Sequence, residues 1–485
     1  MWEVMEAFLK EVPLIKHQLD SYNDFVNFRI QEIIENSEPI KLSEGDMEIR
    51  FHRCRLEQPK FMEADGSKRS IYPFEARLRR ITYSAPFYIE MGLYEKGIEK
   101  LHEEIYCGQI PVMIKSNLCY LKNLSREELI KVKEDPEDPG GYFIIDGNEK
   151  FIVGVEDPAP NKIIVNKSEK PGEVVATIFC ERNGITAKQT VTRNASGIYY
   201  VEFPGSPKNL KLFILILALG LTSQKEMEKM FDSTLKKNEL IFNLKEIEMD
   251  KMSQAIEYIG KRIAPGQSAT VRRNLTEYLL DFRVLPHIGT TKEKRLQKAY
   301  TLLKIAEKCM NVAFNITPED DRDHYGNKRV RRAGDLLENL FVGALNELKT
   351  DLVYQAERIE LRKRKITLKT IVRPDKFTGH IQRAMATGIW SQTRTGIAEI
   401  LDRTCFMSAM SNLRVVKNIV QKSGTNLEMR ELHGTHYGRL CPVTTPEGAG
   451  IGLTKHLAIC GVISSGIRDQ KYEEEIMSLG VEKIE

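Results

Sequence analysis

Residues 433–453, which read HGTHYGRLCPVTTPEGAGIGL, restrict the fold of this chain more than any other stretch. Pro442 and Pro446 fix their own φ angles, and the glycines at 448, 450 and 452 permit backbone paths closed to residues with a Cβ. The stretch therefore predicts a shaped loop that carries Arg439 and Glu447. The alternative is a structural turn that binds nothing, because clusters of proline and glycine mark loops more often than sites.

Length and composition indicate a multidomain globular protein. The 485 residues are enough for about three domains, and 41% hydrophobic with 29% charged residues is an ordinary globular composition. The longest apolar run, residues 212–221, is about half as long as a membrane helix. Residues 1–13 mix charges with apolar side chains, unlike a signal peptide. We therefore expect a cytoplasmic protein.

The distribution of charge along the chain indicates candidate nucleic-acid contacts better than the net charge does. A net charge of +4 does not identify a nucleic-acid binder. Basic residues are in clear excess in residues 358–373 and again in residues 403–439. The first cluster fits a solvated helix face as well as a binding site. For the second we favour phosphate contacts, because its arginines lead directly into the proline- and glycine-rich stretch.

Two groups of residues resemble metal ligands. The eight cysteines form no CxxC pair, but His433, His436 and Cys441 lie within nine residues and supply three of the four ligands that zinc needs. Loop imidazoles more often bond to the backbone, so we predict no metal there. The DDRD stretch at 320–323 offers three carboxylates, yet Pro318 favours a helix start at which carboxylates cap amides.

The periodicity of the chain predicts an α+β protein. Asp146-Gly147-Asn148 is a strong hairpin turn between residues 142–145 and 151–155. Long helices are expected before Pro318 and after Gly334. The first has Leu296, Ala299, Leu303, Ala306 and Met310 on one face; the second has Asp335 as its cap and then an apolar repeat at 336, 340, 344, 348, 352, 356 and 359. An antiparallel meander is expected from strands at 163–166, 174–181, 186–193 and 199–203, followed by helices over 208–263.

The proline- and glycine-rich stretch resembles the signature of the second-largest subunit of cellular DNA-directed RNA polymerases, H-x-T-H-[YW]-G-x-x-C-P-x-x-T-P-E-G-x-x-x-G-L. Residues 140–156 and 320–337 agree with the same family, most closely with its archaeal and eukaryotic branch. Only 32 residues follow Leu453. The resemblance therefore implies an amino-terminal half, as in archaea that split this subunit. The signature is matched by His433, Thr435, His436, Tyr437, Gly438, Cys441, Pro442, Thr445, Pro446, Glu447, Gly448, Gly452 and Leu453.

The family's domain order implies five parts here. A protrusion-like α/β domain would occupy residues 1–156 and return at 319–386. A lobe-like insertion of antiparallel strands and helices would occupy 157–318. A mixed fork-like region would follow at 387–460, and residues 461–485 would lead to the partner half.

The resemblance also implies a function. The chain would be one subunit of a multisubunit polymerase that copies a DNA template into RNA from the four ribonucleoside triphosphates. Its partners would be the carboxyl-terminal half, the largest and other subunits, DNA, RNA, nucleotides and initiation factors. Mg²⁺ would be held mainly by the largest subunit, so this chain would carry no complete active site and no cofactor. The alternatives are a stand-alone nucleic-acid-binding scaffold, or a metal-dependent phosphoryl-transfer enzyme centred on 320–323.

Nine residues are predicted to lie near nucleic acid or nucleotide. The alternative for Arg394, Arg403 and Arg414 is a place on a helix surface or in an ion pair, for example between Arg403 and Asp402. Glu447 would either organise basic side chains of the partner half or cap a turn through its carboxylate. Lys422 would lie at the tip of a fork loop at 420–426. The nine are Arg394, Arg403, Arg414, Lys417, Lys422, Arg430, His436, Arg439 and Glu447.

Overall fold

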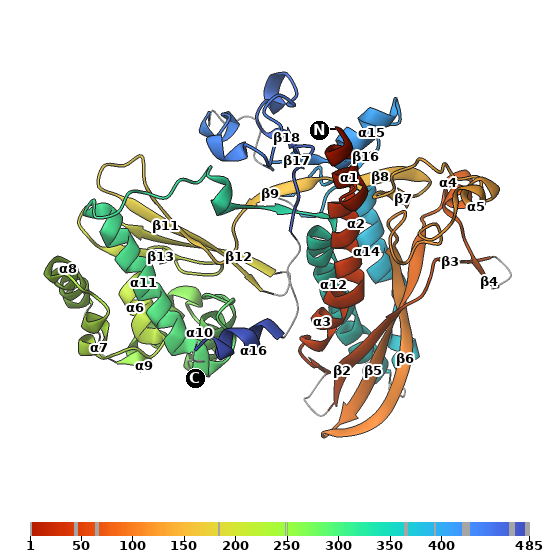
Figure 1. Ribbon diagram of the computed structural model, residues 1–485. Helices are drawn as coiled ribbons and strands as arrows, with labels where there is room; N and C mark the ends of the chain where they lie inside the picture. Colours follow the sequence, from red (N-terminus) through yellow and green to blue (C-terminus); the bar gives the residue numbers. More distant parts are fainter. Residues whose placement is uncertain are drawn as a thin grey trace. The chain divides into compact units, whose positions relative to one another are not determined.

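The computed structural model describes residues 2–42, 47–63, 67–182, 185–247, 249, 251–362, 367–391, 394–419, 427–464 and 471–480. The chain forms two compact units (Figure 1). Unit 1 comprises Met1–Val155, Val330–Gly424 and His436–Glu485; unit 2 comprises Glu156–Arg329 and Thr425–Thr435. Both contain helices and antiparallel sheets, which confirms the α+β class. The five family-derived parts and their names stay predictions.

Unit 1 is built on a four-stranded antiparallel sheet in the order β1-β2-β5-β6. Helices α12 and α14 pack on it (Figure 1), and Phe87 of β5 stacks on Phe377 at 5.3 Å between ring centroids and meets Phe341 edge-on at 5.6 Å. One core thus joins strands from the start of the chain to helices that follow unit 2 in sequence. The elements are β1 (Ile40–Lys41), β2 (Met47–Leu56), β5 (Ser84–Glu95), β6 (Ile98–Pro111), α12 (Ala333–Leu361) and α14 (Pro374–Thr387).

Helix α12 begins slightly earlier than predicted. It starts at Ala333, and Asp335 caps it from within the first turn, where its carboxylate accepts the Arg332 amide at 3.0 Å. Gly334 is required because a Cβ there would lie 1.9 Å from the carbonyl oxygen of Ser21 in α2 (Lys16–Asp24). The predicted apolar repeat is confirmed for its first six members, which are buried, and its last member, Ile359, is half-buried against the same core. The six are Leu336, Leu340, Ala344, Leu348, Leu352 and Ala356.

The predicted hairpin is confirmed with a tighter turn. β7 (Phe143–Ile145) and β8 (Asn148–Ile152) pair across Asp146 and Gly147, whose φ angles are 50° and 79°. Asn148 therefore belongs to the strand, and a separate strand, β9 (Gly154–Pro158), follows. β16 (Ala398–Ile400) adds to β8.

A second four-stranded sheet carries the proline- and glycine-rich stretch. Its order is β15-β9-β17-β18. β17 (Val415–Lys417) pairs in parallel with β9 and antiparallel with β18 (Thr454–His456). The stretch therefore leads directly into a strand of the unit's own framework.

Unit 2 contains the predicted meander, a five-stranded antiparallel sheet in the order β10-β11-β12-β13-β14. The turn expected at 183–184 lies outside the described residues. Helix α6, with every side chain buried, and α11 share one core with the sheet. The elements are β10 (Ile163–Lys167), β11 (Val174–Arg182), β12 (Ile185–Arg193), β13 (Tyr199–Glu202), β14 (Leu210–Lys211), α6 (Leu212–Ala218) and α11 (Arg295–Ala313).

One predicted core position is wrong. Leu296 is 47% exposed, although Ala299, Leu303, Ala306 and Met310 of the same face are buried. The first turn of α11 directs Arg295 inward instead, where its Nε donates to Asp281 at 2.6 Å. The hydrophobic contact of this face therefore begins one turn later.

No helix among the described ranges combines the length and apolar character that crossing a bilayer requires. The remaining helices and strands complete the two units. They are α1 (Trp2–Glu11), α3 (Ile30–Glu35), β3 (Lys60–Met62), β4 (Lys68–Ser70), α4 (Pro73–Arg79), α5 (Arg126–Lys131), α7 (Gln224–Lys229), α8 (Thr234–Lys245), α9 (Met252–Ile263), α10 (Ala269–Phe282), β15 (Lys328–Arg331), α13 (Leu368–Ile371), α15 (Phe406–Leu413) and α16 (Lys471–Ser478), with a π-helical turn at Phe25–Arg29.

Candidate functional site

The proline- and glycine-rich loop, residues 437–453, is anchored at its base by backbone hydrogen bonds. Leu440 and Leu457 form an antiparallel bridge. The Cys441 amide donates to the carbonyl of His456 at 2.8 Å, and the Ala458 amide donates to the carbonyl of Arg439 at 2.9 Å. Both arms of the loop are thus tied to each other beside β18.

The interior of the loop is held by one threonine. The Thr445 hydroxyl donates to the carbonyl of Thr454 at 3.0 Å and accepts the Gly452 amide at 3.0 Å. Gly448 and Gly452 have φ angles of 78° and 70°, which favour glycine. A 3₁₀ turn at Gly448–Gly450 is the regular structure of this tip. The prediction of a shaped loop is confirmed.

The loop presents both side chains that the sequence singled out. Arg439 and Glu447 are exposed. Glu447 precedes the 3₁₀ turn, but its carboxylate makes no capping hydrogen bond to it. The turn-capping alternative for Glu447 is therefore not the arrangement that the structure adopts.

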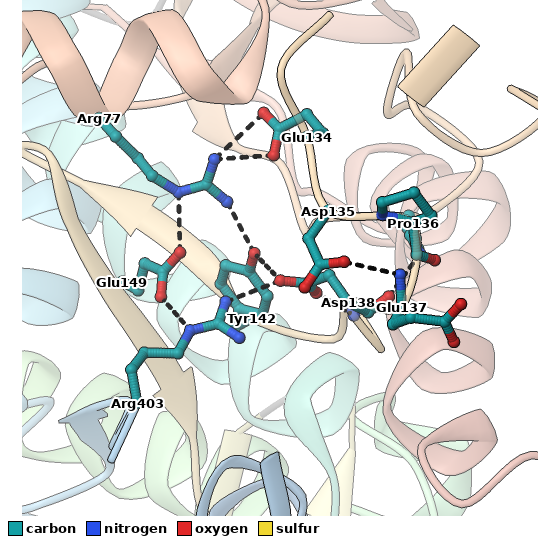
Figure 2. A network of polar contacts seen from close by, with 11 residues as sticks. Arg77, Glu134, Asp135, Pro136, Glu137, Asp138, Tyr142, Glu149 and Arg403 are labelled. Carbon is teal, nitrogen blue, oxygen red and sulfur yellow. Dashed lines mark hydrogen bonds and ion pairs between the residues drawn. The ribbon is translucent and has the colours of Figure 1, made fainter. Parts of the chain in front are cut away.

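Arg403 is engaged within unit 1 (Figure 2). Its Nε donates to Glu149 at 2.6 Å, its Nη2 donates to Asp138 at 2.8 Å, and the guanidinium lies 4.8 Å from the centre of the Tyr142 ring. The partner suggested by sequence, Asp402, instead accepts bonds from Thr404 and Ser408. Arg403 therefore forms ion pairs, but with carboxylates more than 250 residues away.

Arg77 completes this polar network, which we call the Arg77–Arg403 network (Figure 2). The Arg77 guanidinium donates to Glu149 at 2.7 Å, to Glu134 at 2.9 Å and to the Tyr142 hydroxyl at 2.7 Å. The Tyr142 hydroxyl donates in turn to Asp138 at 2.9 Å. Burial raises the pKa of the Tyr142 phenol well above its ordinary value, so the phenol stays protonated as that donor. The cluster ties β7 and β8 to Arg403, which precedes α15.

Two further predicted contacts are also internal. Arg414 is buried, and its guanidinium donates to the carbonyls of Leu14 and Ala458, each at 2.6 Å. Burial lowers its pKa from the ordinary value. The ammonium of Lys417 lies 2.5 Å from a carboxylate oxygen of Glu399. Both cations hold the framework beside β17, which leaves less of their charge for a phosphate.

The last four predicted residues are placed differently from one another. Arg394 and Arg430 are half-buried. His436 is buried, and its carbonyl accepts the amides of Arg439 and Leu440 at 2.9 Å. Lys422 and the predicted fork loop at 420–426 lie outside the described residues.

The acidic stretch at 320–323 is bound to its surroundings in unit 2. Asp320 accepts the Val165 amide at 2.9 Å, and Asp323 pairs with Lys328 at 2.8 Å. Asp321 accepts the amides of Asp323 and His324, and its second oxygen lies 2.9 Å from Nε2 of His433. Asp320 and Asp321 thus accept backbone amides as predicted, although in a turn and not at an α-helix. Within the described ranges, no three His, Cys, Asp or Glu side chains converge as a metal site.

The sequence did not reveal the Arg77–Arg403 network. Arg77 is 72 residues from Glu149, and Arg403 is 254 residues from it. The residues that flank Arg77 form an ordinary short helix, α4. Nothing local to either arginine indicates the other, so only the folded structure brings them together.

Comparison with known proteins identifies the family. Residues 13–379 match the family described as RNA polymerase beta subunit, and residues 399–463 match RNA polymerase Rpb2, domain 3. The chain belongs to the RNA polymerase beta subunit family. The resemblance inferred from residues 433–453 is confirmed.

The most similar relatives include archaeal polymerase subunits. The chain is 41% identical to DNA-directed RNA polymerase subunit Rpo2N of Methanocaldococcus jannaschii over 99% of both chains. It is 40% identical to subunit Rpo2N of Methanothermobacter thermautotrophicus over 99% of this chain and 98% of that one. It is 38% identical to subunit Rpo2 of Saccharolobus solfataricus, of which it covers only 43%. These matches do not favour the stand-alone scaffold.

Proposed function

We propose that this chain, as a subunit of a multisubunit DNA-directed RNA polymerase, forms one wall of the cleft for DNA and RNA and contributes to promoter DNA and nucleotide binding. The polymerase copies DNA into RNA from the four ribonucleoside triphosphates. One observation carries the proposal: loop 437–453 combines a backbone tied at both arms with an outward arginine and glutamate. A loop of this kind can hold charges at fixed positions before a ligand arrives.

The two exposed side chains suit different tasks. Arg439 can donate to phosphate oxygens in a bidentate manner. Glu447 would repel a phosphate, so its useful contact is a cation, and we assign that cation to a basic side chain of a partner subunit. Through this contact Glu447 positions a positive charge for the triphosphate or the nucleic-acid backbone. Glu447 is accordingly a positioning residue.

Metal chemistry is assigned to other subunits. Nucleotide addition requires carboxylates that hold two Mg²⁺ ions. The acidic cluster at 320–323 does not fit this task, because its carboxylates already bind amides, Lys328 and His433. We therefore place Mg²⁺ mainly in the largest subunit.

The partner that completes the subunit is proposed to be a separate polypeptide. The chain matches Rpo2N proteins over nearly their whole length, whereas it covers 43% of the Saccharolobus solfataricus Rpo2. The rest of that longer subunit would correspond to the partner half. Initiation factors are proposed as further partners of the assembled enzyme, which we place in the cytoplasm.

The test is Glu447→Gln in a polymerase reconstituted from all its subunits. Losing one charge-assisted contact in the transition state should slow single-nucleotide addition about tenfold, which corresponds to about 1.4 kcal/mol. Assembly, measured by gel filtration, should be unchanged. Glu127→Gln, an exposed glutamate of α5, is the matched control and should leave the rate unaltered. A normal addition rate in assembled Glu447→Gln enzyme would overturn the role given to this loop.

A further inference from the structure

The N-terminal helix of unit 1 lies beside the segment that follows β18. The Sγ atom of Cys460 is 3.9 Å from the Sδ atom of Met5 in α1. Arg414 ties the residues that directly follow α1 to the segment after β18, because it donates at once to the carbonyls of Leu14 and Ala458. Two independent contacts therefore hold these segments together, although Met5 and Cys460 are 455 residues apart in sequence.

Both segments carry large exposed apolar side chains. Helix α1 buries none of its residues, and Trp2 and Val4 are 76% and 72% exposed. Ile459 and Val462 of the second segment are 61% and 62% exposed. We call these four side chains the α1–β18 surface. Exposed apolar side chains scattered singly are ordinary, but a group that includes a tryptophan, on segments fixed to each other, is typical of a protein contact.

The charged residues around the α1–β18 surface indicate which charge a partner surface would carry. Lys10 pairs with Glu6 at 3.1 Å, which neutralises that carboxylate. Glu3 and Glu11 are exposed and give α1 a net negative charge. A partner surface that fits would present an apolar patch bordered by lysine or arginine.

We propose that the α1–β18 surface docks the polypeptide that corresponds to the part of Rpo2 not covered by this chain. This inference rests on the proposed function and adds to it a specific contact surface. The surface is continuous with loop 437–453, because the Ala458 amide bonds to the carbonyl of Arg439. In Saccharolobus solfataricus the chain's counterpart shares one polypeptide with a remainder that is larger than itself. The α1–β18 surface adjoins the loop that this remainder is proposed to complete.

Cross-linking in the assembled polymerase identifies the occupant. A photoreactive benzoylphenylalanine at position 2 or 459 should cross-link to the polypeptide carrying the remainder, and mass spectrometry would identify the peptide. The thiol of exposed Cys460 should react with a maleimide at least tenfold more slowly in the polymerase than in the isolated chain, whereas exposed Cys405 serves as an internal reference. Cross-links solely to another subunit or to a second copy of this chain, or none at all, would overturn the proposal.

A paired substitution measures how much the α1–β18 surface contributes to retention of the chain in the polymerase. Trp2→Ser with Ile459→Ser should reduce at least tenfold the amount of chain retained on immobilised polymerase after a high-salt wash. Leu235→Ser with Val271→Ser, at exposed apolar positions of unit 2, is the control and should leave retention unchanged. Both variants should melt like the parent chain, because the side chains are exposed. Normal retention of the first variant would refute docking here, while the Glu447→Gln kinetics would still test the proposed function separately.

Discussion

Arg403 and Arg439 lie in the same basic stretch of sequence, yet the fold uses them in opposite ways. Arg403 is held by Glu149, Asp138 and the Tyr142 ring, whereas Arg439 is exposed on loop 437–453. The fold brings the carboxylates of Glu149 and Asp138 to Arg403, whereas it leaves the side chain of Arg439 exposed. Local basic charge therefore does not decide which arginines are exposed and which form internal ion pairs.

The largest loss of stability is expected from a substitution at the centre of the Arg77–Arg403 network. Arg77→Met would leave the buried carboxylate of Glu134 and the carboxylate of Glu149 without this cation. Removing one partner of a buried ion pair costs about 3 kcal/mol, because the other charge stays desolvated. Urea unfolding of the isolated chain, followed by tryptophan fluorescence and circular dichroism, would measure the loss.

An exposed ion pair supplies the control for this substitution. Arg126 pairs with Glu137 at 2.9 Å, and the two side chains are 73% and 69% exposed. Arg126→Met should change the free energy of unfolding by no more than about 0.5 kcal/mol. Equal effects of the two substitutions would show that the Arg77–Arg403 network is no more than a set of solvated pairs.

A second prediction contrasts a buried arginine with an exposed one. Arg414→Ala removes two charge-assisted bonds and leaves the carbonyls of Leu14 and Ala458 without that donor, which should destabilise unit 1 by about 2 kcal/mol. Arg439→Ala should leave the free energy of unfolding within about 0.5 kcal/mol of the parent. It should instead weaken nucleotide binding by the assembled polymerase. Both unfolding measurements use the isolated chain, and nucleotide affinity uses single-turnover kinetics.

The opposite pattern would contradict this assignment. If Arg439→Ala unfolds the chain while Arg414→Ala slows only nucleotide addition, then the exposed residue is structural and the buried one is functional. Arg414→Lys is an informative intermediate, since one ammonium cannot reproduce the planar fork that reaches both carbonyls.

The parts that could be predicted from sequence are those with local causes. The hairpin at Asp146-Gly147, the meander of unit 2 and the apolar repeat of α12 depend on turn residues and periodicity. The shape of loop 437–453 follows in the same way from its prolines and glycines. The partners of Arg403 and the burial of Arg414 depend on segments hundreds of residues away, to which neither residue's neighbours give any clue.

The smallest predicted effect concerns Asp402, which follows β16 and sits next to Arg403 in sequence. Hydrogen bonds from the Ser408 hydroxyl and from Thr404 lower the pKa of the Asp402 carboxyl from 3.8 to about 2. A carboxyl whose pKa is lowered by folding stabilises the folded chain at every pH above its ordinary pKa of 3.8. This contribution is lost as the pH falls from 3.8 toward 2. Arginine plays no part in that shift, although Arg403 is adjacent.

Arg403→Ala should therefore leave the titration of Asp402 almost unchanged, whereas Ser408→Ala should move its midpoint upward. NMR of chain labelled with ¹³C at aspartate carboxyls, followed between pH 2 and pH 6, would report both midpoints. An upward shift in Arg403→Ala alone would mean that sequence neighbours do pair here, and the contrast between Arg403 and Arg439 would then lose its structural basis. An upward shift in Ser408→Ala alone would show that the Ser408 hydroxyl, and not Arg403, stabilises the Asp402 carboxylate. That result agrees with the pairing of Arg403 with Glu149 and Asp138.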